Sequence, residues 1–175
     1  LKAAGHRTGL VCLNSFAGAA KLLRDIDDVF ALPGSGLLAA LDRGWPGALS
    51  LLHSWIAETA LRFGADRVIN LTPTLAARVF SRVLGVADTR GFTLDEFGFG
   101  GYSSPWAAFL QAASLHRGCS PFNLVDLFLR VSDLQSGSSL LQTPHAKLPD
   151  EIVAATSTLV AFQLGSSQDY RRWPV

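Results

Sequence analysis

Short apolar segments alternate along this chain with longer segments of helical periodicity, and this alternation restricts the possible folds more than any other feature. Three segments have the length and the flanking Gly, Pro or Asn residues of buried strands, and they are 8–14, 27–34 and 66–72. A segment with helical signals follows each of them. This order predicts an α/β fold with an open, mostly parallel sheet of about four or five strands and helices on both faces.

The strand cores VCLN (11–14), VFAL (29–32) and VINL (68–71) are expected to be neighbours in that sheet, buried on both faces. A long helix is predicted over 46–65, because Pro46 suits a first turn and Gly64 a helix end. Further helices are expected at 15–26, at 74–85 and after residues 104 and 121, with a last buried strand at 158–164.

Polar or small residues directly follow the expected strands. An open parallel sheet binds ligands at the carboxyl ends of its strands, so these residues are candidates for a binding site. They are Asn14 and Ser15, Gly34 to Gly36, and then Asn70, Thr72 and Thr74. The last three follow the clearest strand and are expected to line an open cleft, although Thr72 can equally cap the next helix.

Several classes of site are disfavoured. Cys12 and Cys119 do not form a C-x-x-C motif, and the four histidines lack ligand spacing, so no metal or redox site is predicted. The nucleophile-elbow pattern G-x-S-x-G does not occur. A formal net charge of +1 argues against a nucleic-acid-binding protein. The adjacent Asp27 and Asp28 are interpreted as a turn and a solvated face rather than an acid/base pair.

Two glycine-containing segments have alternative interpretations. GSGLLA (34–39) matches G-x-G-x-x-A in letters, but Glu58, the acidic residue about 20 positions further on, falls within the long helix. A turn is therefore favoured over a nicotinamide site. The second segment, 86–104, is expected to be a long glycine-rich loop, with a strand pair as the alternative. FGFGGYSSPW (97–106), which begins within it, is either a lid or a surface loop with aromatic residues packed beneath it, and the loop is favoured.

The C-terminal segment contains the elements of a phosphate cradle. The strand at 158–164 runs into Gly165, Ser166 and Ser167, and a cation and a helix-starting proline follow at Arg171 and Pro174. Backbone amides, hydroxyls and a guanidinium suit a phosphate or pyrophosphate. An ordinary strand-to-helix turn with a surface arginine is an equally good interpretation.

This last segment, VAFQLGSSQDYRRWPV, resembles the one that opens the C-terminal domain of glycosyltransferase family 9, the ADP-heptose:lipopolysaccharide heptosyltransferases. The resemblance continues upstream through LKAAGHRTGLVCLNSFAGAAKLLRDIDDVFALPG, DRVINLTPTLAARVFSRVLGVADTRGF, SPWAAFL and FNLVDLFLRVSDL, in family order. It implies a Rossmann-like domain, the N-terminal half of a GT-B fold.

The resemblance also implies a domain division. It assigns 1–135 to the acceptor-side domain without its first strand, 136–157 to a linker, and 158–175 to the start of the donor-side domain. The absence of methionine suggests a true start further upstream. The family's proposed catalytic base lies on a loop after that first strand, so no catalytic residue is assigned in this chain. Arg171 stands where lysine is typical of the family.

Ser166, Ser167 and Arg171 would bind the donor diphosphate, and Asn70, Thr72 and Thr74 would line the acceptor side. The implied function is inverting transfer of a heptose-like sugar from a nucleotide-diphosphate donor, an ADP-sugar, to a lipopolysaccharide-core glycolipid. It needs no cofactor or metal, and it belongs in the bacterial cytoplasm at the inner face of the inner membrane. The fragment itself is expected to be inactive. A non-catalytic Rossmann-like scaffold is the alternative, and a nicotinamide-dependent enzyme is a weaker one.

Overall fold

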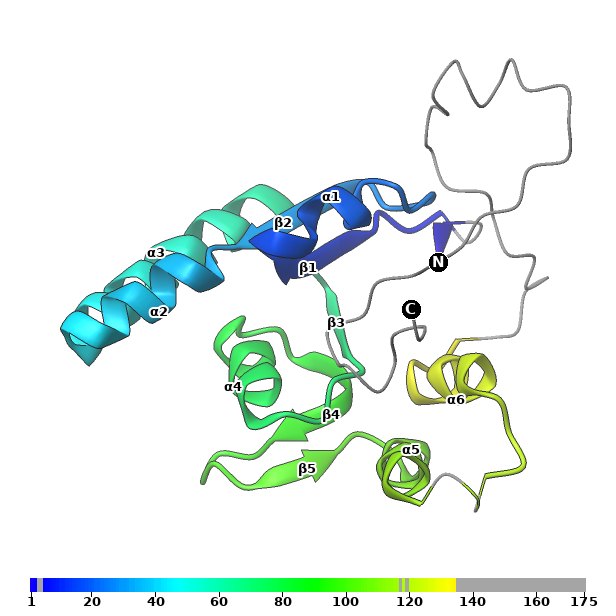
Figure 1. Ribbon diagram of the computed structural model, residues 1–175. Coiled ribbons are helices and arrows are strands. Elements are labelled where there is room, and N and C mark those ends of the chain that lie inside the picture. Colours follow the sequence, from blue (N-terminus) through cyan, green and yellow to red (C-terminus); the bar gives the residue numbers. More distant parts are fainter. Residues whose placement is uncertain (3–4, 117, 119, 135–175) are drawn as a thin grey trace, which may run out of the picture. The chain divides into compact units, whose positions relative to one another are not determined.

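The computed structural model describes residues 1–134, apart from residues 3, 4, 117 and 119 (Figure 1). All described residues belong to one compact unit of the chain, Leu1–Pro144. The linker at 136–157 and the expected start of a second domain at 158–175 lie outside the described residues. The elements in chain order are β1 (Gly9–Leu13), η2 (Asn14–Phe16), α1 (Ala17–Ala20), β2 (Asp28–Leu32), α2 (Gly34–Arg43), α3 (Trp45–Phe63), β3 (Arg67–Asn70), α4 (Leu75–Val83), β4 (Asp88–Leu94), β5 (Gly100–Tyr102), α5 (Pro105–Leu115) and α6 (Leu124–Val131).

The predicted α/β class is confirmed, because helices alternate with strands that pair largely in parallel. β1 pairs in parallel with β2, from Gly9↔Asp28 to Leu13↔Leu32. β3 pairs in parallel with β4, and β4 pairs in antiparallel fashion with β5. The strand pair that the sequence left open in the glycine-rich segment is therefore present as β4 and β5.

The expectation that the first three strands are neighbours in one sheet is wrong for the described residues. β1 and β2 form one sheet, and β3 belongs to a second sheet in the order β3-β4-β5. The partner of β3 is a strand within the segment that was expected to be a loop. Burial of β1 on both faces is also wrong, since Val11 and Leu13 are 37% and 44% exposed.

The helices agree with the sequence where strong boundary residues occur. α3 has Pro46 in its first turn and ends at Gly64, whose φ of 62° is the left-handed conformation that favours glycine. α1 is much shorter than predicted, with Leu22 and Leu23 exposed beyond its end. The expected turn at Gly34 to Gly36 is instead the first turn of α2.

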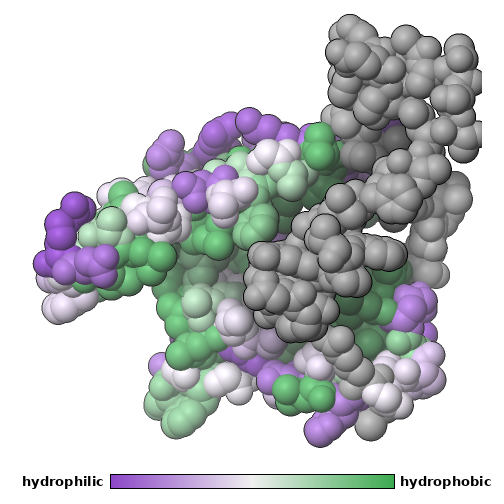
Figure 2. Space-filling model, in the orientation of Figure 1, coloured by the Kyte–Doolittle hydropathy of each residue, from purple (hydrophilic) through white to green (hydrophobic). Residues whose placement is uncertain are grey.

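The main hydrophobic core joins β4 to α5 and α6. Phe92 of β4 is almost completely buried among residues of the two helices, which are Ala107, Leu110, Ala113, Leu127 and Val131. Apolar side chains are also exposed on α2 and α3, among them Leu38, Trp45 and Leu61, and Figure 2 shows hydrophobic surface there between polar side chains. No helix within the described ranges is long and apolar enough to cross a membrane.

Candidate functional site

The three acceptor-side candidates lie at the carboxyl end of β3 and the start of α4. Asn70 is the last residue of β3, Thr72 lies in the connection, and Thr74 is the N-cap of α4. The side chain of Thr74 accepts a hydrogen bond from the backbone N–H of Ala77 at 3.3 Å. The capping role considered for Thr72 therefore belongs to Thr74, and Thr72 itself is exposed.

Asn70 is buried, with only 7% of its surface exposed. Its Nδ2 donates to the carbonyl oxygen of Phe92 at 2.8 Å, and its Oδ1 accepts from the backbone N–H of Thr72 at 3.0 Å. The first bond extends the β3–β4 pairing one residue beyond the last backbone pair, Asn70↔Gly91. Both ends of the amide are thus occupied by contacts that hold the sheet and the connection together.

Gly91 is the point at which β4 changes partner. β4 pairs with β3 up to Gly91, and from Phe92 onward β4 pairs with β5. Gly91 has a φ of 95°, and a Cβ atom there would lie 2.0 Å from the backbone oxygen of Asn70. Its N–H donates to Ser103 Oγ at 2.7 Å, and its carbonyl accepts from the Ser103 N–H at 3.0 Å. Only glycine fits this position without displacing β3.

Arg78 is the principal residue of this region that the sequence analysis missed. Its side chain is directed from α4 into the structure and is 6% exposed. The guanidinium donates to the carbonyl oxygens of Pro73 at 3.1 Å, Thr93 at 2.9 Å and Gly101, and to Gln111 Oε1 at 3.0 Å. Arg78 therefore links the β3–α4 connection, both strands of the hairpin and α5.

The guanidinium of Arg78 also lies over two aromatic rings. The distances from its Cζ atom to the ring centroids are 5.0 Å for Phe92 and 5.3 Å for Tyr102. Each contact is a cation–π interaction, which partly offsets the loss of hydration of a buried cation. The available signal in the sequence was a second arginine four residues later, Arg82, which places two like charges on one face of a helix.

A cavity of about 450 Å³ lies between α4 and β4, which are neighbours in Figure 1. Cationic and hydroxyl side chains dominate the polar part of its wall. The lining residues are Arg78, Ser81, Arg82, Gly85, Val86, Ala87, Thr89, Thr93 and Leu94. Arg82 Nη1 donates to the carbonyl oxygen of Leu94 at 3.1 Å, which holds this guanidinium near the carboxyl end of β4. We call this cavity the α4–β4 groove.

The hairpin between β4 and β5 presents exposed aromatic side chains. Phe97 and Phe99 are 77% and 70% exposed, so the favoured interpretation of aromatic residues packed beneath the loop is wrong for these two. Asp95 closes the turn, because its Oδ1 accepts from the backbone N–H groups of Phe97 at 2.9 Å and Phe99 at 2.8 Å.

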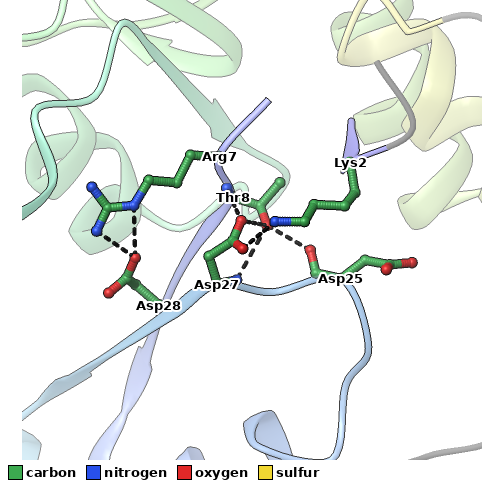
Figure 3. A network of polar contacts seen from close by, with 6 residues as sticks. All are labelled: Lys2, Arg7, Thr8, Asp25, Asp27 and Asp28. Carbon is green, nitrogen blue, oxygen red and sulfur yellow. Dashed lines mark hydrogen bonds and ion pairs between the residues drawn. The ribbon is translucent and has the colours of Figure 1, made fainter. Parts of the chain in front are cut away.

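Asp27 and Asp28 lie in a network of polar contacts at the amino ends of β1 and β2 (Figure 3). Asp27 pairs with Lys2 and accepts from the backbone N–H of Thr8 at 2.8 Å. These bonds, the one from Lys2 foremost, lower the pKa of Asp27 from 3.8 to about 2. Asp28 pairs with Arg7 at 2.8 Å and with Arg62 at 3.8 Å.

Asp27 is exposed in the turn before β2, as the sequence predicted, but a solvated face is wrong for Asp28, which begins β2 and has a side chain only 13% exposed. Both accept bonds from cations of the same chain, and they lie at the end of the strands opposite to the carboxyl edge where ligands bind in such sheets. Among the described residues, no group of three His, Cys, Asp or Glu side chains could hold a metal ion. His53 is exposed on α3.

Ser166, Ser167 and Arg171, the donor-side candidates, lie outside the described residues. Comparison of the chain with protein-family models, with curated proteins and with solved structures found no match.

Proposed function

We propose that the chain is the acceptor-side part of an inverting glycosyltransferase. The enzyme would transfer a heptose-like sugar from an ADP-sugar to a lipopolysaccharide-core glycolipid, in the cytoplasm at the inner face of the inner membrane. A base deprotonates the acceptor hydroxyl, and cations and helix N-termini stabilise the departing nucleoside diphosphate. Ser166, Ser167 and Arg171 are assigned to that diphosphate.

The observation that carries the proposal is the parallel β3–α4–β4 unit. The segment 66–92, one of those that resemble the family, covers β3, α4 and the first part of β4, residues 88–92. It is preceded by a second parallel pair, β1 and β2, as the resemblance implies. The proposal requires these two pairs to belong to one Rossmann-like sheet in the intact enzyme. An experimental structure of the intact protein with the pairs in separate sheets would overturn it.

The direct test uses the complete open reading frame that encodes this chain. The purified protein is incubated with an ADP-sugar and a truncated lipopolysaccharide core, and ADP release and the mass of the glycolipid are followed. We expect ADP release that depends on the acceptor, and a product of inverted anomeric configuration. An Arg171→Ala variant should reduce turnover about ten- to a hundredfold, because a charge-assisted contact to the diphosphate is lost.

A non-catalytic scaffold is the second candidate, and the buried state of Asn70 favours it. The side chain of Asn70 donates to the carbonyl oxygen of Phe92, and that of Thr74 accepts from the backbone N–H of Ala77. Two of the three acceptor-side candidates therefore already have structural partners. An upstream loop with glycine and aspartate after a strand would favour the enzyme. A reading frame without that loop, whose product neither binds an ADP-sugar nor releases ADP, would favour the scaffold.

A further inference from the structure

The α4–β4 groove combines positive charge with hydroxyl groups. Arg78 and Arg82 line it one helical turn apart, and three hydroxyl side chains complete its polar wall: Ser81, Thr89 and Thr93. Its volume of about 450 Å³ lies within the range of small-molecule sites. No carboxylate of the described residues contributes to the lining.

The charge of the two arginines is uncompensated in the part of the chain that the structure describes. No ion pair joins Arg78 or Arg82 to a carboxylate among these residues, whereas Arg7, Arg62, Arg67 and Arg90 all have one. The partners of Arg78 are neutral oxygens and aromatic rings. The negative end of the helix dipole favours an exposed cation such as Arg82 in the last turn of α4. It does not explain the second arginine, Arg78, which is buried one turn earlier.

The groove also retains hydrogen-bond donors for a ligand. Only Nη1 of Arg82 is used, in its bond to Leu94, and the hydroxyl of Thr93 has no partner among the described residues. Ser81 and Thr89 donate to the backbone oxygens of Ala77 and Val86, which fixes their hydroxyl oxygens in the wall. Several N–H donors on a planar guanidinium, with a hydroxyl beside them, match the oxygens of a phosphoryl group.

We propose that the α4–β4 groove binds the phosphoryl group of a phosphate monoester, held by Arg82 and Thr93 beside the positive charge of Arg78. A doubly charged anion offsets two guanidinium charges, which a single carboxylate does not. The groove is larger than a phosphate ion, so the remaining space accommodates the group to which the phosphate is attached. This site does not depend on the proposed transferase function.

The test is a titration of the ¹⁵N-labelled chain with inorganic phosphate at constant ionic strength. The amide signals of Thr89 and Leu94 should shift and saturate, with a Kd of about 1 mM or lower. Potassium chloride should give no saturating shift. The variant Arg82→Gln should weaken phosphate binding about tenfold or more, because it removes the charged guanidinium but keeps an extended polar side chain at this position.

The matched control is Arg43→Gln. Arg43 also lies in the last turn of its helix, is exposed and lines a cavity, but the described residues of that cavity include no second arginine and no hydroxyl side chain. This variant should bind phosphate as the original chain does. Equal weakening by both substitutions, or shifts that do not saturate, would overturn the site.

The source of the phosphoryl group is distinguished by further ligands. Glucose 6-phosphate, AMP and phosphatidylcholine vesicles with and without phosphatidic acid are titrated into the same chain. Binding of one of them more tightly than phosphate, lost in Arg82→Gln, identifies the attached group as sugar, nucleotide or lipid. If none of them competes with bound phosphate, the assignment to a phosphate monoester is wrong. A Thr93→Val variant supplies a second check, since it should weaken phosphate binding without changing charge.

Discussion

Replacement of Gly91 by alanine is the sharpest perturbation that the fold offers. The new Cβ would lie 2.0 Å from the backbone oxygen of Asn70 and 3.0 Å from its carbonyl carbon, both of which are main-chain atoms that cannot rotate away. The φ of 95° is also unfavourable for alanine, at a cost of about 1–3 kcal/mol. β3 must therefore move away from β4.

That movement breaks identifiable bonds. The pairing at Asn70↔Gly91 and the bond from Asn70 Nδ2 to Phe92 are lost, at about 0.5–1.5 kcal/mol each. Together with the backbone strain, the free energy of unfolding should fall by about 2–6 kcal/mol, a large share of the usual stability of a domain.

Urea unfolding followed by far-UV circular dichroism measures this loss, with Gly47→Ala as the matched control. Gly47 lies in α3, and a Cβ atom there would meet nothing within 4 Å, so alanine should be neutral or stabilise by up to about 1 kcal/mol. A Gly91→Ala protein that unfolds within about 1 kcal/mol of the original chain would refute the reasoning on the partner change in β4. If the Gly91→Ala protein does not fold, this supports the reasoning only when the Gly47→Ala control folds normally.

Three further outcomes are expected. Arg78→Ala should lower the free energy of unfolding by about 3–5 kcal/mol, whereas Arg82→Ala, at an exposed position, should lower it by under about 1 kcal/mol. Equal losses of stability in urea unfolding would contradict the linking role of Arg78. The folded-state pKa of Asp27 is lowered, so its contribution to stability is present above pH 3.8 and is lost as the pH falls towards about 2. Urea midpoints of the original chain and of Asp27→Asn should therefore converge across that window, and a constant difference would contradict the network of Figure 3. Thr74→Ala should lower the free energy of unfolding by about 1 kcal/mol, because the N-cap bond of α4 is lost, and an unchanged urea midpoint would contradict this.

The parts of the fold that the sequence predicted well are those fixed by local interactions. Pro46 and Gly64 delimit α3 because a first turn tolerates a residue without an N–H and a helix end favours a left-handed glycine. The start of α5 at Pro105 follows the same rule. Helix α1 was predicted too long: it ends at Ala20, and Leu22 and Leu23, which the prediction placed within it, are exposed beyond its end.

Strand partners depend on residues that are distant in the sequence, and here the prediction failed. β4 has a glycine at its centre and charged residues at its start, so its sequence, DTRGFTL, resembles a loop. Its strand conformation depends on Phe92, which is buried by α5 and α6, and on cross-strand partners in β3 and β5. No window of a few residues contains that information.

The positions of the three acceptor-side candidates relative to β3 and α4 could be predicted, but the contacts of their side chains could not. That Asn70 ends a strand follows from the residues around it, whereas its partner, the Phe92 carbonyl, is 22 residues away. The left-handed conformation of Gly91 leaves that carbonyl beyond the last β3–β4 backbone pair, and the amide of Asn70 supplies the bond. An alanine at Asn70 would therefore destabilise the sheet whether or not an acceptor binds there. Thr72 is exposed on the same connection, so of the three predicted residues its substitution distinguishes acceptor binding from folding most directly.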